Sequence, residues 1–244
     1  MATAYRSMAA RPVTDVPVLE AGDCQRIHAT LERLRPHWVW RGRGFATLGV
    51  AAYLDAARSK DPERTYHGRL VQGNRRLQEQ FGDTLDRVAA TLAELLAAPT
   101  RFLPELALPG FHVFEGPGIA TSGAAPHFDL QHLALRWPDG TDLRERISFT
   151  LAVKLPAAGG ALEHWHVTER DLRRLSRLGR PVSTAVLGRL LPARRHAYRE
   201  GWMAVQQAPV MHRIAPVPTR RPGDQRITLQ GHGVRHRSGW ILYW

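Results

Sequence analysis

Apolar side chains recur at helical spacing in two stretches of the first 100 residues. The longer stretch ends before Pro99, and its apolar positions are Leu77, Phe81, Leu85, Val88, Leu92 and Leu95. The shorter one begins at Asp23, the expected helix cap, and ends at Pro36; its apolar face is Cys24, Ile27, Leu31 and Leu34. Continuous stripes of this kind usually pack against a sheet, so we predict two such helices.

From about residue 110 the pattern changes to short extended segments bounded by glycine and proline. Residues 147–155 alternate large apolar side chains with small or polar ones, which is the period of a half-buried strand. Further strands are expected at 111–115, 130–137, 162–167, 202–206, 210–215, 225–230 and 240–244. Many short strands separated by turns are typical of a sandwich or a barrel. We therefore predict a mostly β fold with N-terminal helices.

The 244 residues suit one large domain or two small ones, and a hydrophobic content of 43% is enough for a sizeable core. We predict one domain, with a helical support layer over about residues 1–108 and a β core over about residues 109–244. Residues 1–19 are expected to form a loose arm or a short strand. Residues 38–49 are expected to be irregular or extended.

Residues 168–200 interrupt the strands with a basic segment, which we predict to be a helical insertion. Thr168 to Asp171 resemble a helix start. The arginines of the segment include Arg173, Arg174, Arg177, Arg180, Arg189, Arg194, Arg195 and Arg199. The favoured interpretation is a solvated helical face. The alternative is a lid over the open end of the β core, with arginines for an anionic substrate.

Cysteine content and hydropathy limit where the protein is expected to work. Cys24 is the single cysteine, which excludes an intrachain disulfide and a cysteine-based zinc site. No run approaches the roughly 18 apolar residues that a membrane span requires. The first residues lack the apolar core of a secretory signal. We expect a soluble cytoplasmic protein with no membrane partner.

The net charge of +12 comes almost entirely from arginine, since Lys60 and Lys154 are the only lysines. Such a charge occurs in proteins that bind nucleic acid, anionic surfaces or acidic substrates. Many arginines beside abundant alanine, leucine, glycine and proline are also typical of a GC-rich coding sequence. We favour this compositional explanation over a nucleic-acid partner.

The tripeptide His127-Phe128-Asp129 precedes one of the expected strands. Side chains alternate faces in an extended chain, so His127 and Asp129 should share one face while Phe128 points away. An imidazole and a carboxylate on one face are two thirds of the two-His, one-carboxylate site that holds non-haem Fe(II). The motif is short and also arises by chance, so its meaning depends on a third ligand.

A third ligand and an anion-binding pair follow on later strands. His212 lies in the expected strand 210–215. Arg226 and Thr228 are two residues apart, so they share a face of the expected strand 225–230. A guanidinium beside a hydroxyl suits one end of a small dicarboxylate, because the planar fork binds a carboxylate through two hydrogen bonds.

With these residues the sequence resembles the Fe(II)/2-oxoglutarate-dependent dioxygenases, of the prolyl-hydroxylase-like and phytanoyl-hydroxylase-like kind. Their pattern is His-x-Asp, a distant His, and Arg-x-Ser/Thr, and the likeness covers roughly residues 109–240. It implies a double-stranded β-helix (jelly-roll) core. It also implies Fe(II) held by His127, Asp129 and His212, and 2-oxoglutarate bound through Arg226 and Thr228, with Gln131 as a further contact.

The resemblance also implies a reaction. The co-substrates are 2-oxoglutarate and O2, ascorbate is a supporting reductant, and the products are succinate, CO2 and an oxidised substrate. Halogenating members of the family replace the carboxylate ligand by a small residue. Asp129 therefore favours hydroxylation, or a related oxidation such as desaturation or ring closure.

The sequence also offers alternative ligands and further polar residues near the expected site. Asp129 and His212 are 83 positions apart (212 − 129), so His164 and His166 are alternative third ligands. His232 and His236 are expected at the surface or in a turn, and His112 and Lys154 at edge or outer-face positions. Tyr66 and Asn74, before the long helix, could reach substrate.

The leading hypothesis is hydroxylation of a small molecule, such as an amino acid or a natural-product intermediate. One alternative is an oxygenase acting on a peptide, a protein or a nucleic acid. Another is a cupin-like or nucleic-acid-binding module without catalysis. The oligomeric state is not predicted by the sequence.

Overall fold

The structure, a computed structural model, describes residues 13–42, 44–116, 123–177, 183–207, 210–217, 219 and 221–244. The helices are α1 (Ala21–Arg33), α2 (Gly68–Leu95), α3 (Glu169–Arg177) and α4 (Thr184–Leu190). Short helical turns are η1 (Arg35–His37), η2 (Ala52–Ala56), η3 (Glu63–His67) and η5 (Gln131–Ala134). In this part of the chain, no helix combines the length and the apolar character needed to cross a bilayer.

Twelve strands are described. They are β1 (Val13–Pro17), β2 (Val39–Gly42), β3 (Phe45–Leu48), β4 (Thr100–Phe102), β5 (Gly110–Glu115), β6 (Thr141–Lys154), β7 (Leu162–Thr168), β8 (Arg194–His196), β9 (Trp202–Gln206), β10 (Val210–Ile214), β11 (Gln225–His236) and β12 (Gly239–Tyr243).

These strands form two sheets. The large sheet has the order β1-β9-β6-β11-β5-β3-β2, and β12 pairs with β11 and with β4. The small sheet has the order β10-β7-β8. An isolated antiparallel bridge between His127 and His212 extends the small sheet beyond β10. The β-strand expectation is confirmed, and the arrangement is an open jelly-roll sandwich rather than a closed barrel.

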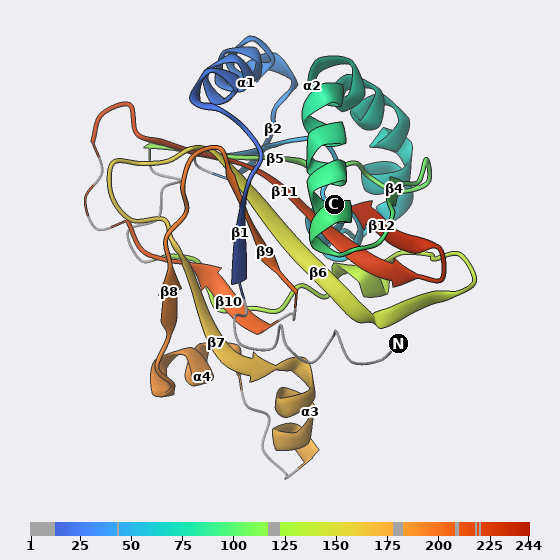
Figure 1. The fold of residues 1–244 in the computed structure, drawn as a ribbon. Coiled ribbons are helices and arrows are strands. Elements are labelled where there is room, and N and C mark those ends of the chain that lie inside the picture. Colours follow the sequence, from blue (N-terminus) through green and yellow to red (C-terminus); the bar gives the residue numbers. More distant parts are fainter. Residues whose placement is uncertain are drawn as a thin grey trace.

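Helices α1 and α2 cover one side of the large sheet, and the small sheet lies on its other side (Figure 1). The alternation along β11 explains this layering. Ile227 and Leu229 belong to the same apolar cluster as Leu31 of α1 and Leu85 of α2. Side chains at the intervening positions of β11 face the small sheet instead. The predicted helical layer over a β core is therefore what the chain forms.

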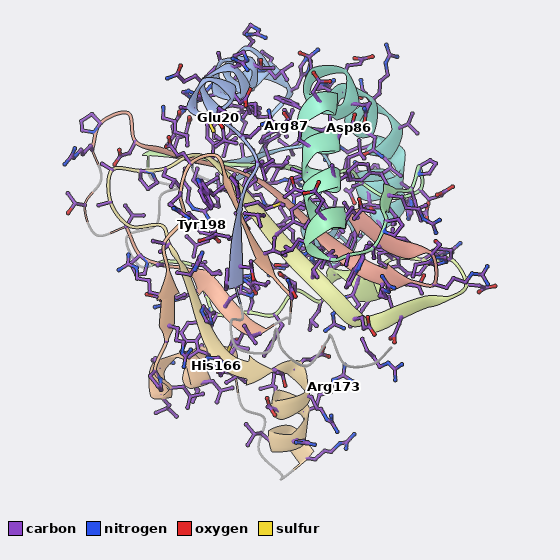
Figure 2. The ribbon with its side chains drawn as sticks, viewed as in Figure 1. Glu20, Asp86, Arg87, His166, Arg173 and Tyr198 are labelled. Atoms are coloured by element: carbon purple, nitrogen blue, oxygen red, sulfur yellow. The ribbon has the colours of Figure 1, made fainter. Side chains whose placement is uncertain are left out.

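Polar contacts fix the two helices to each other. Arg87 of α2 pairs with Asp23 of α1 at 2.8 Å and donates a hydrogen bond to the Val18 carbonyl. Figure 2 labels Arg87 at this junction. Asp23 is not the helix cap that the sequence predicted. Glu20 is the cap, and Asp23 is the third helical residue of a capping box, in which its carboxylate accepts from the Glu20 amide.

The N-terminal half contributes strands as well as helices. β1 pairs with β9 at one edge of the large sheet, and β2 and β3 form the other edge. The expected short strand within residues 1–19 is thus β1, while residues 1–12 lie outside the described part. The stretch 38–49, expected to be irregular or extended, contains the β2–β3 pair.

The strand predictions differ from the structure in three places. β6 begins at Thr141, six residues before the predicted start at residue 147. Residues 130–137 do not form a strand, because the chain turns into the 3₁₀ turn η5 directly after Asp129. β11 continues to His236, well beyond the predicted end at Gln230. His232 and His236 are therefore buried strand residues and not surface or turn residues.

The basic segment supplies part of the small sheet as well as helices. β8 pairs with β7, so residues 194–196 belong to the core and not to an insertion. Leu187 of α4 and Leu172 of α3 pack with Trp165 and Met211. Those two residues alternate with His164 and His212, so the helices cover the outer face of the small sheet. This packing fits the favoured solvated helical face better than a lid.

His112 of β5 faces the interior, contrary to the expected edge or outer position. It is only 6% exposed and is the cross-strand partner of Thr228 on β11. Burial, reinforced by the charge of Arg226, lowers the pKa of His112 to about 3, so the imidazole is neutral at pH 7.

Lowering the pH should destabilise the protein through His112. His112 is protonated near pH 6.5 in the unfolded chain and only near pH 3 in the folded chain. The stability that the neutral ring contributes is therefore complete above pH 6.5 and declines as the pH falls towards 3. At pH 5 the loss is about 2 kcal/mol. Urea unfolding of wild type and His112→Asn at pH 7 and pH 5 measures it. An equal acid-induced loss in both proteins would contradict the assignment.

A close packing contact at Gly110 gives a second prediction. A Cβ at this position would lie 2.1 Å from the Trp244 ring and 2.8 Å from the Leu48 carbonyl oxygen. Gly110→Ala should lower the free energy of unfolding by about 1–3 kcal/mol, because strand and ring must separate. Gly42→Ala is the control, since a Cβ there meets nothing within 4 Å, and it should change stability by less than about 0.5 kcal/mol. Equal changes in the free energy of unfolding for Gly110→Ala and Gly42→Ala would show that the contact between Gly110 and Trp244 is not rigid.

Candidate metal centre

Two backbone hydrogen bonds bring His127 next to His212. The His127 amide donates to the His212 carbonyl at 2.9 Å, and the His212 amide donates to the His127 carbonyl at 3.0 Å. The imidazole ring centroids are consequently 4.6 Å apart. The 83-position gap between Asp129 and His212 is no obstacle, because β10 returns to the side of the tripeptide.

Asp129 completes a cluster of three ligand-type side chains. One ligand atom from each of His127, Asp129 and His212 lies within 4.8 Å of the others. Nε2 of His212 is 3.6 Å from Oδ2 of Asp129, and Nε2 of His127 is 4.0 Å from Oδ1. Phe128 points away and packs against the apolar cluster of the outer face that contains Trp165, as the predicted alternation requires.

The hydrogen bonds of the two rings determine where their protons lie. Nδ1 of His127 is 2.9 Å from the Ala125 carbonyl, and Nδ1 of His212 is 2.9 Å from the Val210 carbonyl. A carbonyl oxygen only accepts, so in the neutral rings each Nδ1 carries the proton and each Nε2 presents a lone pair. Two lone pairs and a carboxylate then converge with no proton between them. A bound cation relieves that repulsion, so the donor set fits a metal ion.

The electrostatics of the cluster agree with this donor set. Burial opposes the charge of Asp129, and positive charge at His212, His232 and His127 lowers its pKa below the usual value. With both metal-facing rings neutral, a bound cation would supply that positive charge. Burial, together with His212, lowers the pKa of His127 and keeps that ring neutral. The side chain of His127 is 43% exposed against 11% for His212.

His232 belongs to this neighbourhood, although the sequence interpretation placed it at the surface. Its Nδ1 lies 3.8 Å from Oδ2 of Asp129, and its ring lies beside Tyr243 with centroids 5.5 Å apart. The period of two along β11 could have identified it, because Arg226, Thr228 and His232 differ by even numbers of residues. The signal was missed because the predicted strand ended too early.

Arg226 and Thr228 lie on the same inner face of β11. Arg226 is 2% exposed; its Nε donates to the Gly160 carbonyl at 3.3 Å, and its Nη1 donates to the Thr228 hydroxyl at 3.4 Å. Its Nη2 has no geometrically formed hydrogen bond within the described part of the chain, although the buried Tyr198 ring lies 5.3 Å from the guanidinium and interacts with its charge. A buried cationic group with a free donor is costly. The pair therefore fits the carboxylate of a small acid, as a co-substrate site requires.

The remaining predicted site residues have different positions. Gln131 is buried on η5, two residues after Asp129, and its contact with a co-substrate remains a prediction. His164 pairs with His212 across β7 and β10 but lies outside the three-residue cluster. His166, labelled on β7 in Figure 2, is exposed. Lys154 is partly buried and donates to Gln225.

Tyr66 and Asn74 are bound to the backbone rather than directed at a substrate. The Tyr66 hydroxyl accepts from the Ala107 amide at 3.0 Å. The Asn74 side chain donates to the Leu106 carbonyl and accepts from the Leu108 amide. Both residues connect the start of α2 to the segment before β5, so their suggested role as substrate contacts is not supported.

No protein-family model matches the sequence, and no curated protein matches it. Solved structures do match. The N-substituted L-amino acid dioxygenase from Burkholderia ambifaria aligns over 96% of this chain and 86% of its own, with 13% identity and a TM-score of 0.57. The non-heme alpha ketoglutarate dependent epimerase SnoN from nogalamycin biosynthesis aligns over 92% and 81%, with 20% identity and a TM-score of 0.51.

A third match is HygX from Streptomyces hygroscopicus, a structure with nickel and 2-oxoglutarate bound. It aligns over 91% of this chain and 82% of its own, with 16% identity and a TM-score of 0.51. At these identities the likeness is one of fold. The chain therefore has the jelly-roll fold of the Fe(II)/2-oxoglutarate-dependent oxygenases, as the sequence resemblance implied.

Proposed function

We propose that this protein is an Fe(II)- and 2-oxoglutarate-dependent oxygenase that oxidises a small molecule. The observation that carries the proposal is the convergence of two Nε2 lone pairs and one carboxylate with no proton between them. This donor set is characteristic of non-haem Fe(II) sites that keep positions open for other ligands. When bound, Fe(II) and 2-oxoglutarate supply oxidative chemistry that consumes O2 and releases succinate and CO2.

The chain's own residues would hold and orient the reactants. His127, Asp129 and His212 are the proposed metal ligands, and the carbonyls of Ala125 and Val210 keep both imidazoles in the tautomer that binds a metal. Arg226 and Thr228 are proposed to bind the distal carboxylate of 2-oxoglutarate. Gln131 is proposed as a further contact. Ascorbate would act only as a supporting reductant.

The carboxylate ligand limits the type of oxidation. With Asp129 as a ligand, no small residue leaves room for a halide, so we propose hydroxylation or a related oxidation such as desaturation or ring closure. The substrate is proposed to be an amino acid or a natural-product intermediate. Two structural neighbours support this proposal, since one is a dioxygenase of N-substituted L-amino acids and the other an epimerase of nogalamycin biosynthesis. A cytoplasmic location remains our expectation.

Removal of a ligand should strongly weaken metal binding, and the neighbouring His164 provides a matched control. His127→Ala and His212→Ala should each weaken Fe(II) or Mn(II) binding by at least about a hundredfold, which is beyond the effect of a residue that only supports a ligand. His164→Ala should leave the affinity within a few-fold, because His164 lies one strand away from the cluster. Anaerobic calorimetric titration measures the three values. Loss of binding in His164→Ala with retention in His212→Ala would reverse the ligand assignment.

Turnover of 2-oxoglutarate without a substrate tests the reaction class. Protein with Fe(II), ascorbate, O2 and 2-oxoglutarate should form succinate slowly. Asp129→Ala should abolish this formation, and Arg226→Gln should raise the 2-oxoglutarate concentration needed for half-maximal rate by about tenfold or more, since a charged hydrogen bond is lost. Chromatographic quantification of succinate follows both. Wild-type protein that binds neither metal nor 2-oxoglutarate would refute the proposed function.

A further inference from the structure

A second polar group lies beside Arg226 on the inner face of the large sheet. In the register of β11 with β5, Thr228 is opposite His112 and Arg226 is opposite Phe114. Arg226 and His112 are therefore diagonal neighbours, a separation that long and aromatic side chains can bridge. Phe114 contacts both, with its ring 5.8 Å from the Arg226 guanidinium and 5.9 Å from the His112 ring.

His112 has one satisfied and one unsatisfied nitrogen. Its Nε2 is 2.9 Å from the Tyr53 hydroxyl. Its Nδ1 is buried and has no hydrogen-bond partner among the described residues, although aromatic rings including Phe45 and Trp244 surround the imidazole. A buried polar atom without a partner costs free energy. The unpartnered Nδ1 therefore indicates that a bound ligand supplies its hydrogen-bond partner.

The Tyr53 contact permits the His112 tautomer that an acid requires. Burial raises the pKa of the Tyr53 hydroxyl, so Tyr53 keeps its proton and can donate it to Nε2. A neutral imidazole that accepts at Nε2 carries its proton on Nδ1. In this tautomer His112 offers a free N–H donor, and its diagonal neighbour Arg226 offers a free Nη2 donor. Two free donors and the Thr228 hydroxyl match a carboxylate, whose two oxygens have about four acceptor sites.

Tyr53 is held in place by a buried ion pair. Arg41 of β2 donates to both oxygens of Asp55 at 2.6 Å, and Asp55 also accepts from the Ala51 amide at 2.9 Å. Arg41 further donates to Thr47 of β3 at 2.9 Å. These bonds fix η2, which carries Tyr53, against the edge of the large sheet. The N-terminal segment thus determines the orientation of the His112 ring.

We propose that His112 is a third side-chain contact for the distal carboxylate of the bound 2-oxo acid, and that Tyr53 is the residue that positions it. This inference rests on the proposed function and extends it, because it assigns a binding role to β5 and to the N-terminal segment. The co-substrate site would then comprise Arg226 and Thr228 from β11, His112 from β5 and, indirectly, the Arg41–Asp55 pair.

The test compares two acids that differ in the distal carboxylate. Metal-loaded protein is titrated anaerobically with 2-oxoglutarate and with oxalate, which chelates a metal but has no distal carboxylate. His112→Gln and His112→Phe should each raise the dissociation constant for 2-oxoglutarate by about ten- to a hundredfold, as expected for a lost hydrogen bond to a charged group. Binding of oxalate should be unchanged.

Two substitutions separate the donor atom from the shape of the ring. His112→Asn keeps an N–H donor at the position of Nδ1 and should bind 2-oxoglutarate within about threefold of wild type, whereas glutamine reaches only the position of Nε2. Tyr53→Phe should weaken the binding of 2-oxoglutarate by a smaller factor than His112→Gln does, and it should leave the binding of oxalate unchanged. Tyr66→Phe is the matched control, because it also removes a buried hydroxyl but lies outside the site. Thermal unfolding establishes that each variant is folded. If His112→Phe does not fold, the comparison of His112→Gln with His112→Asn tests the role of His112.

The outcomes distinguish this inference from the proposed function. Wild-type protein that binds a metal but not 2-oxoglutarate would refute the co-substrate site as a whole. Wild-type protein that binds 2-oxoglutarate, with His112→Gln binding it equally well, would refute the role of His112 alone. Equal weakening of oxalate and 2-oxoglutarate binding in the His112 variants would also refute the role of His112, because the effect would then lie at the metal.

Discussion

The candidate centre depends on a single β-bridge. Two backbone hydrogen bonds hold His127 against His212, and they align the side chains of two segments that are far apart in sequence. Their geometry also leaves each Nδ1 beside a carbonyl two residues earlier in its own segment, so both Nε2 atoms face Asp129. β7 and β8 support β10 from its other edge, and the packing of Phe128 against the outer apolar cluster holds the bridge from outside.

The alternation along β11 separates stability from chemistry. Ile227 and Leu229 pack beneath α1 and α2, where burial of apolar surface stabilises the sheet. The opposite face carries Arg226, Thr228 and His232, which are buried but polar. A protein interior rarely leaves a buried polar atom without a partner. The free donors of Arg226 and His112 are therefore better explained by a bound acid than by the stability of the fold.

Some of this site was accessible from the sequence because its signals are local. The period of two predicted that His127 and Asp129 share a face, and that Arg226 and Thr228 do. Other features depend on pairing between distant segments. His112 was expected at an edge, yet its cross-strand neighbour Thr228 places it inside. His232 was expected in a turn, because the length of β11 is determined by its partners β6 and β12 rather than by its own residues.

The amino-acid sequence alone therefore determined the two N-terminal helices with their apolar faces, most of the strands after residue 110, and the residue types able to bind a metal and an acid. These follow from periodicity and side-chain chemistry, which act within a few residues. The tertiary structure decided that His212 and not His164 closes the cluster, that residues 130–137 turn instead of extending, and that His112 and His232 face inward. Such outcomes depend on strand register and on the crossing of segments far apart in the chain, and no local pattern encodes them.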